Sequence, residues 1–293
     1  MTLYQLLAEG TAALKRSGIL ETDAERDARE LLLAAFEMDL ARFLLERTRQ
    51  MPEDEISFRK TEKYRQLIAR RSERRPQQQI LGCQEFMGLP FYVDENVLIP
   101  RQDTETLVEL VLAEQGRTAG KKKCLLDLCT GSGCIAISLA VKGQFPSVAA
   151  TDISAAAIAV AERNAKTLVP AQKIRFYQGD LFAALPEGCF DVIVSNPPYI
   201  PTAVIAGLEP EVRDFEPHQA LDGSADGLAF YRRIAAEAGG YLADGGSLYL
   251  EIGYDQGAAV AELLRVAGFA NVRIHRDLAG HDRVVSAYGF AHS

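Results

Sequence analysis

The sequence predicts an α/β protein in which a small all-helical domain and a β-hairpin connector precede a doubly wound, seven-stranded sheet. Apolar residues recur at helical spacing through about the first 75 residues, and short apolar pieces separated by turn residues follow them. From Lys123 onward, expected strands and helices alternate, which is typical of a parallel sheet with helices on both faces. We therefore expect a helical domain, a connector and a sheet domain, at 1–75, 76–103 and 104–293.

The helical domain is expected to contain at least three helices. Gly18 is expected to end the first helix, and Thr22 or Asp23 to cap the second. Pro52 is expected to begin another helical segment, because proline is tolerated in the first turn of a helix.

The last helix of this domain is strongly basic in a chain whose formal net charge is −8. A solvent-facing helix surface is the simpler interpretation. The alternative is a positive surface for a macromolecule with acidic or phosphate groups. The basic residues are Arg59, Lys60, Lys63, Arg65, Arg70, Arg71, Arg74 and Arg75.

The connector is expected to hold two short strands on either side of Gly88 and to end at Pro100. Asp103 or Thr104 is then expected to cap a helix that runs to about Glu114. The last two strands of the sheet should pair antiparallel, because their connection is too short for a right-handed crossover. The expected strands are 123–128, 147–151, 174–178, 190–195, 247–250, 272–275 and 283–288, and the expected helices among them are 134–141, 154–166, 226–238 and 256–267.

An Asn-Pro-Pro-Tyr segment follows the fourth expected strand. Prolines have no N–H for a strand ladder, so the chain leaves the sheet at Asn196, where open α/β sheets bind ligands. Pro197 and Pro198 restrict the backbone, and the Asn196 carboxamide and the neighbouring carbonyls become rigid acceptors for a planar –NH2 group. Tyr199 can lie against the plane of that group. The segment resembles the catalytic motif of amino methyltransferases, the alternative being a capped turn with structural prolines.

A glycine-containing loop after the first expected strand indicates an adenosine-type cofactor. Gly131, Gly133 and Ala136 fit the G-x-G-x-x-A pattern, and Asp152 follows at the end of the second strand. The pattern alone fits NAD or S-adenosylmethionine equally, and Asp152 could instead be a helix N-terminal acid. The Asn-Pro-Pro-Tyr segment favours S-adenosylmethionine, because it has no role in hydride transfer.

With both sites in view, the sequence resembles the bacterial protein-(glutamine-N5) methyltransferases that modify peptide chain release factors. The likeness covers nearly the whole chain. The family usually has Gly at position 129 and Pro at 102, where this chain has Cys129 and Gln102. Because Cys129 leaves the loop with two glycines, we expect it to adopt φ < 0. The pieces that carry the resemblance are Leu81–Gly82, Phe86, Gly88–Leu89, Ile99–Glu105, Leu126–Gly133, Ser195–Ile200, Phe215–Pro217, Ala220–Leu221 and Asp226–Leu228.

The resemblance implies a Rossmann-like methyltransferase sheet, S-adenosylmethionine as cofactor, and a substrate glutamine in the Gly-Gly-Gln tip of a release factor. It also implies that the N-terminal helices grip the body of the release factor. The implied catalytic residues are Asn196, Pro197, Pro198 and Tyr199, and the implied cofactor-binding residues are Cys129, Thr130, Gly131, Ser132, Gly133, Asp152, Asp180, Leu181 and Asn196.

In the mechanism we infer, the methyl group passes directly to the amide nitrogen without a general base. We therefore interpret Glu251 as an acid that stabilises the end of a strand or a loop. The alternative functions are methylation of an exocyclic amine of RNA or DNA, and a non-catalytic scaffold that binds the cofactor.

The composition of the chain argues against a membrane protein, a metal site and a nucleic-acid substrate. No apolar run reaches the roughly 18 to 20 residues of a membrane span, and no signal peptide is evident, so we expect a cytoplasmic protein without membrane contact. The five cysteines include no Cys-x-x-Cys pair and the four histidines are scattered, so we expect no metal. The acidic balance argues against a nucleic-acid substrate.

Overall fold

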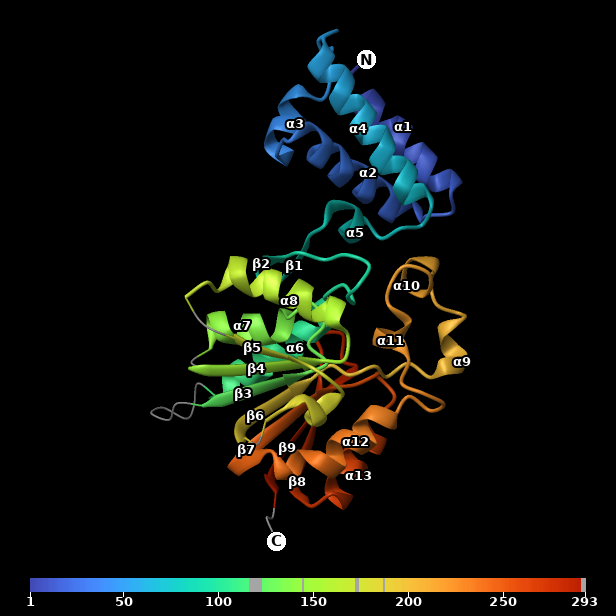
Figure 1. The fold of residues 1–293 in the computed structure, drawn as a ribbon. Coiled ribbons are helices and arrows are strands. Elements are labelled where there is room, and N and C mark those ends of the chain that lie inside the picture. Colours follow the sequence, from blue (N-terminus) through green and yellow to red (C-terminus); the bar gives the residue numbers. More distant parts are fainter. Residues whose placement is uncertain (116–122, 144, 172–173, 187, 291–293) are drawn as a thin grey trace. The chain divides into compact units, whose positions relative to one another are not determined.

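The computed structural model describes residues 1–115, 123–143, 145–171, 174–186 and 188–290 (Figure 1). They form two compact units. The first unit comprises Met1–Gly82 together with Glu209–Phe215, and the second comprises Cys83–Leu208 together with Glu216–Ser293. No sequence pattern indicates that a short segment so far along the chain packs with the N-terminal helices.

The first unit is helical. Its helices are α1 (Leu3–Arg16), α2 (Glu21–Phe36), α3 (Leu40–Glu46), α4 (Glu55–Ser72), α5 (Gln77–Leu81) and the short α10 (Pro210–Arg213). The expected cap at Thr22 or Asp23 is wrong, because α2 already begins at Glu21 and has no side-chain cap. Both residues instead lie in the first turn, where the negative charge of the Asp23 carboxylate interacts favourably with the positive end of the helix dipole. Asp54 caps α4 by accepting a hydrogen bond from the backbone N–H of Ser57.

Carboxylates of the same unit compensate much of the positive charge of α4. Arg71 is 5 % exposed, and its guanidinium contacts Asp27 Oδ2 at 2.8 Å and Glu211 Oε1 at 2.9 Å. Arg74, which follows the end of α4, also binds Glu211, at 2.6 Å. Arg59, Lys60 and Arg65 have acidic partners as well. The interpretation of the basic residues as a solvent-facing helix surface is therefore wrong for Arg71, which is part of a buried ion network.

The second unit begins with the expected hairpin, formed by β1 (Gln84–Phe86) and β2 (Leu89–Phe91) in antiparallel pairing. Met87 and Gly88 both have positive φ, as a two-residue hairpin turn requires. The helix after the connector, α6 (Gln102–Gln115), begins slightly earlier than expected.

Seven strands form the sheet, in the order β5-β4-β3-β6-β7-β9-β8. Neighbouring strands are parallel to one another along the row β5-β4-β3-β6-β7. The strand β9 is antiparallel to both of its neighbours, β7 and β8, which confirms the expected pairing of the last two strands. Strand order reverses at β3, because β4 lies on one side of it and β6 on the other; such a reversal is where open α/β sheets bind ligands. The strands are β3 (Cys124–Leu128), β4 (Ser147–Asp152), β5 (Ile174–Gln178), β6 (Phe190–Ser195), β7 (Leu242–Glu251), β8 (Phe269–Arg276) and β9 (Asp282–Phe290).

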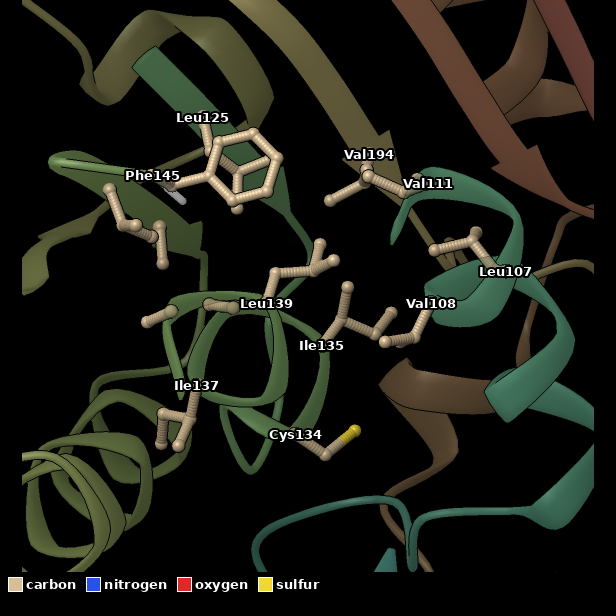
Figure 2. Close-up of a cluster of buried hydrophobic side chains, with 14 of the residues drawn as sticks. Leu107, Val108, Val111, Leu125, Cys134, Ile135, Ile137, Leu139, Phe145 and Val194 are labelled. Atoms are coloured by element: carbon tan, nitrogen blue, oxygen red, sulfur yellow. The ribbon is translucent and has the colours of Figure 1, made fainter. Parts of the chain in front are cut away.

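Helices cover both faces of this sheet (Figure 1). On one face lie α6, α7 (Cys134–Lys142) and α8 (Ala155–Leu168); on the other lie α12 (Ala229–Glu237) and α13 (Gly257–Val266). Figure 2 shows Ile135 and Leu139 of α7 between α6 and the strand residues Leu125 and Val194. Short helical segments complete the unit, namely η1 (Leu181–Ala184), α9 (Thr202–Ile205), α11 (His218–Leu221) and η2 (Ala238–Gly240).

In the described part of the chain, no helix combines the length and the apolar character needed to cross a membrane. Within the same residues, no three or more His, Cys, Asp or Glu side chains are grouped so that they could hold a metal ion.

The ion network of the first unit predicts that two aspartates of α2 contribute very differently to the free energy of unfolding. Asp27 is buried against Arg71, so Asp27→Ala should lower the free energy of unfolding by about 1.5–3 kcal/mol, the range for hydrogen bonds to charged groups. Asp23 pairs with Arg26 at the surface, so Asp23→Ala should cost at most about 1 kcal/mol. Urea denaturation of both variants measures this, and equal losses would contradict the structural role of the network.

Candidate active site

A cavity of about 220 Å³ opens where β3, β4 and β6 end. Most of the residues singled out in the sequence line it. Gly133, Pro197 and Tyr199 do not reach its wall. The expected residues that line the cavity are Cys129, Thr130, Gly131, Ser132, Asp152, Asp180, Leu181, Asn196 and Pro198.

The loop after β3 has a backbone that differs from expectation. Cys129 has φ +58°, so the expectation of a negative φ is wrong. The backbone N–H groups of Thr130 and Gly131 are fixed by the Thr151 carbonyl and the Asp152 carboxylate, each at 2.9 Å, and the loop needs a left-handed residue just before them. A non-glycine residue in this conformation costs about 1–2 kcal/mol, which the rest of the fold offsets. Burial raises the pKa of the Cys129 thiol, which keeps it protonated.

The two glycines of the loop have different tasks. A Cβ added to Gly131 would have no heavy atom within 4 Å, so the backbone there faces open space. A Cβ on Gly133 would lie 3.0 Å from Ile137 and 3.1 Å from Ala161, so a glycine lets α7 and α8 pack closely. The N-cap residue of α7 is Gly133, which has no side chain to cap the helix, and the Asp127 carboxylate accepts a hydrogen bond from the Ala136 N–H at 3.2 Å. The first two residues of the helix, Cys134 and Ile135, line the cavity.

Two acidic residues flank the loop. Asp152 accepts hydrogen bonds from the backbone N–H groups of Gly131 and Ser154, each at 2.9 Å, and burial raises its pKa. Asp180 pairs with Arg233 at 2.8 Å. Arg233 and its helix neighbour Phe230 also line the cavity, although nothing in the local sequence marks either residue.

The Asn-Pro-Pro-Tyr segment leaves β6 beside this loop. The Asn196 Nδ2 atom donates to Thr104 Oγ1 at 3.3 Å, so the carboxamide oxygen is left for the cavity. Gln256 Nε2 donates to the Tyr199 carbonyl at 2.9 Å, and burial raises the pKa of the Tyr199 phenol to about 12. A Cβ on Gly227 would lie 2.3 Å from that same carbonyl oxygen. The segment is therefore held by direct packing against residues 223–227.

The connector supplies one wall of the cavity. Arg101 lines it and binds both carboxylate oxygens of the buried Glu216, at 2.7 and 2.8 Å. Asn164 joins the connector to the loop after β3, because its carboxamide binds the backbone of Tyr92 and the Ser132 carbonyl. The motifs at 99–105 and 215–217 thus meet at this wall, whereas Asn164 carries no recognisable sequence signal.

This fold and this cavity define a class, the methyltransferases with a doubly wound sheet. Residues 102–205 match the family described as Methyltransferase small domain, and residues 5–82 match the PrmC N-terminal domain. A methyltransferase from Pyrococcus furiosus superposes with a TM-score of 0.51 at 18% identity, covering 70% of this chain and 90% of that one. At this identity the likeness concerns the fold alone.

Closer relatives narrow the class. The release factor glutamine methyltransferase of Cereibacter sphaeroides is 44% identical, over 98% of both chains. That of Moorella thermoacetica is 43% identical, over 98% of this chain and 99% of its own. The chain therefore belongs to the release factor glutamine methyltransferase family. It is an enzyme, and S-adenosylmethionine is its methyl donor.

Because Gly227 packs against the Tyr199 backbone, replacing it by alanine should destabilise the protein more than replacing Gly245, a glycine of similar backbone conformation. Gly227 and Gly245 have φ +73° and +75°, so each alanine variant should pay about 1–2 kcal/mol of backbone strain. Gly227→Ala should cost about 1–3 kcal/mol more, because its Cβ meets the Tyr199 carbonyl, whereas Gly245 has nothing within 4 Å. Denaturant unfolding compares the two variants, and an equal loss would show that residues 223–227 do not hold the segment.

Proposed function

We propose that this enzyme methylates the side-chain amide nitrogen of the glutamine in the Gly-Gly-Gln tip of peptide chain release factors. The observation that carries this proposal is the Asn196 carboxamide, which ends a strand at the cavity wall with its nitrogen engaged by Thr104. The relatives of 43% and 44% identity are named release factor glutamine methyltransferases, which supports a glutamine of a release factor as the substrate.

The residues around the cavity suit S-adenosylmethionine. Gly131 leaves an open backbone surface, the start of α7 offers N–H groups, and the Asp152 carboxylate can accept hydrogen bonds from ribose hydroxyls. Cys129, Thr130, Ser132 and Gly133 would complete the cradle, while Asp180 and Leu181 would flank the adenine. When bound, the cofactor supplies an electrophilic methyl group on a sulfonium centre.

The Asn-Pro-Pro-Tyr segment would bind and orient the substrate amide. An amide nitrogen is a poor nucleophile because its lone pair is delocalised. Acceptance of an N–H hydrogen by the Asn196 oxygen raises electron density on nitrogen and sets its direction. The Pro197 carbonyl would accept the second hydrogen, although Pro197 does not line the cavity and its carbonyl would have to turn toward the bound amide. Pro198 lines the cavity and would confine the plane of the amide, whereas Tyr199 does not line it and would support the segment through its packing. The methylated amide is strongly acidic while it still carries its extra proton, so solvent can remove that proton without a general base.

The helical unit would bind the body of the release factor. A tripeptide tip offers far less surface than the roughly 800 Å² per partner that a stable protein complex buries, so selectivity needs a second contact. Ion pairs with acidic residues of other helices in the unit reduce the free positive charge of residues 59–75. Shape and apolar contacts would therefore contribute more than a general electrostatic attraction.

Incubation of the enzyme with S-adenosylmethionine and a purified release factor tests the substrate directly. Mass spectrometry of the tip peptide should show one added methyl group on the glutamine. A parallel reaction with ribosomal RNA and DNA serves as the comparison, and methyl incorporation into nucleic acid instead of the release factor would overturn the proposal.

Asn196→Ala tests the proposed acceptor. It should slow the chemical step by on the order of a hundredfold, as the loss of one preorganised hydrogen-bonding group does in other active sites, while cofactor affinity changes little. Asn196→Asp retains an acceptor and should lose less. Single-turnover rates with saturating cofactor measure both variants, and a wild-type rate for Asn196→Ala would make the residue a turn cap only.

Asp152→Ala tests the cofactor cradle. Loss of hydrogen bonds to a charged acceptor should weaken S-adenosylmethionine binding by about 1.5–3 kcal/mol. Asp152→Asn keeps one acceptor oxygen for the ribose or for the Gly131 N–H, so its loss should be smaller. Calorimetry on both variants gives the affinities, and an unchanged affinity for Asp152→Ala would remove Asp152 from the proposed site.

A further inference from the structure

Behind the Asn-Pro-Pro-Tyr segment lies a buried carboxyl group that the proposed reaction does not use. Glu251 ends β7 and is 2 % exposed. It does not line the cavity, and within the described residues its Oε2 atom has no hydrogen-bond partner. The Tyr231 hydroxyl fixes the backbone at this point, because it donates to the Glu251 carbonyl at 2.8 Å. A rigidly held, buried acid at this position requires a function.

Thr104 lies between this acid and the cavity. It belongs to α6, is 2 % exposed, and accepts a hydrogen bond from Asn196 Nδ2. A hydroxyl has one proton, and the neighbouring Glu251 carboxyl group can accept it. Both Thr104 and Asn196 act on Glu251 as hydrogen-bonding neighbours. The three side chains thus form one network that reaches from the end of β7 to the cavity wall.

We propose that Thr104 and Glu251 are positioning residues that fix which end of the Asn196 carboxamide faces the substrate. The –NH2 end points to Thr104 and the Glu251 carboxylate, and the oxygen points to the cavity. This inference rests on the proposed function, in which that oxygen accepts a hydrogen from the substrate amide. Glu251 therefore has a task more specific than stabilising the end of a strand.

The need for such a device follows from the shape of asparagine. The two ends of a carboxamide are nearly identical in size, so packing cannot distinguish them and hydrogen-bond partners must. An ionised carboxylate only accepts hydrogen bonds, which selects the –NH2 end. A protonated carboxyl group can also donate, so it would tolerate the reversed carboxamide, whose –NH2 group would then face the substrate –NH2 group and could not accept from it.

Burial and charged neighbours together place the pKa of Glu251 near neutral pH. Burial raises the pKa of Glu251 to about 7, opposed by the Thr104 hydrogen bond, the Arg283 charge and the Asn196 hydrogen bond, while Asp103 raises it further. Arg283 of β9 is shared with Asp103 and Asp277, each at 3.1 Å. Burial also raises the pKa values of the nearby Tyr199 and Cys134 to about 12, so neither group titrates near neutrality.

The sign of the pH dependence follows from these charges. The selecting form of Glu251 is the carboxylate, whose population increases as pH rises through its pKa of about 7. The single-turnover rate of the wild-type enzyme should therefore rise between about pH 6 and pH 8. In Glu251→Gln no group titrates at this position, so the rate should be lower and the part of its pH dependence that belongs to Glu251 should disappear. Any slope that remains over this range belongs to Asp127 of β3, whose pKa burial also raises to about 7.

Thr104→Val and Thr104→Ser provide the matched pair that tests the network. Valine keeps the shape of threonine without its hydroxyl, so the rate at saturating cofactor and release factor should fall at least tenfold. Serine retains the hydroxyl and should recover most of that loss. Cofactor affinity by calorimetry should stay within about twofold in both variants, because the change concerns the substrate acceptor.

Selective ¹⁵N labelling of asparagine gives a second readout that needs no substrate. The side-chain –NH2 resonance of Asn196, assigned by its loss in Asn196→Ala, should titrate with a midpoint near the Glu251 pKa of about 7 and stop titrating in Glu251→Gln. A wild-type rate in Thr104→Val, or a titration that persists in Glu251→Gln, would overturn the positioning role. A wild-type enzyme that leaves release factors unmethylated would instead refute the proposed function, so the two failures are distinguishable.

Discussion

The parallel pairing of β3 with β6 is the constraint on which the rest of the active site depends. In its register Leu128 lies opposite Ser195, and the Ser195 hydroxyl donates to the Leu128 carbonyl at 2.8 Å. Both strands therefore end at the same level, and the loop at 129–133 emerges beside Asn196. A slip by one residue would turn every side chain of a strand to the other face. Side chains of these strands pack into both hydrophobic layers, so such a slip would disrupt the packing on both faces. The register thereby keeps the loop at 129–133 beside the Asn-Pro-Pro-Tyr segment.

Preorganisation in this site is stored partly as backbone strain. Cys129 occupies a left-handed conformation that would suit glycine, and Leu181, which also lines the cavity, has φ +50°. Such positions persist where surrounding hydrogen bonds and packing over-determine the backbone. Around Cys129 those interactions come from β4, whose Thr151 carbonyl and Asp152 carboxylate hold the next two residues of the loop.

Regular periodicity explains what could be predicted from the sequence. The strand at 190–195 and the helix at 134–141 are mostly apolar, and their boundaries agree with β6 and α7 to within a residue. The positive φ of Cys129 could not be predicted, because it depends on hydrogen bonds to a strand more than twenty residues away. Phe230, Arg233 and Asn164 likewise reach the site through tertiary packing. The partners of Arg71 come from α2 and α10, and no local pattern joins those segments.

The inclusion of residues 209–215 in the helical unit has a consequence for biosynthesis. A ribosome releases the first 82 residues well before it adds Glu211, so the nascent helical unit has Asp27 as a carboxylate partner for Arg71 and still lacks the second. Domains generally fold in the order in which they are made, from the N-terminus. Here the first unit to emerge completes its ion network only after more than half of the second has been translated, which couples the maturation of both units during elongation.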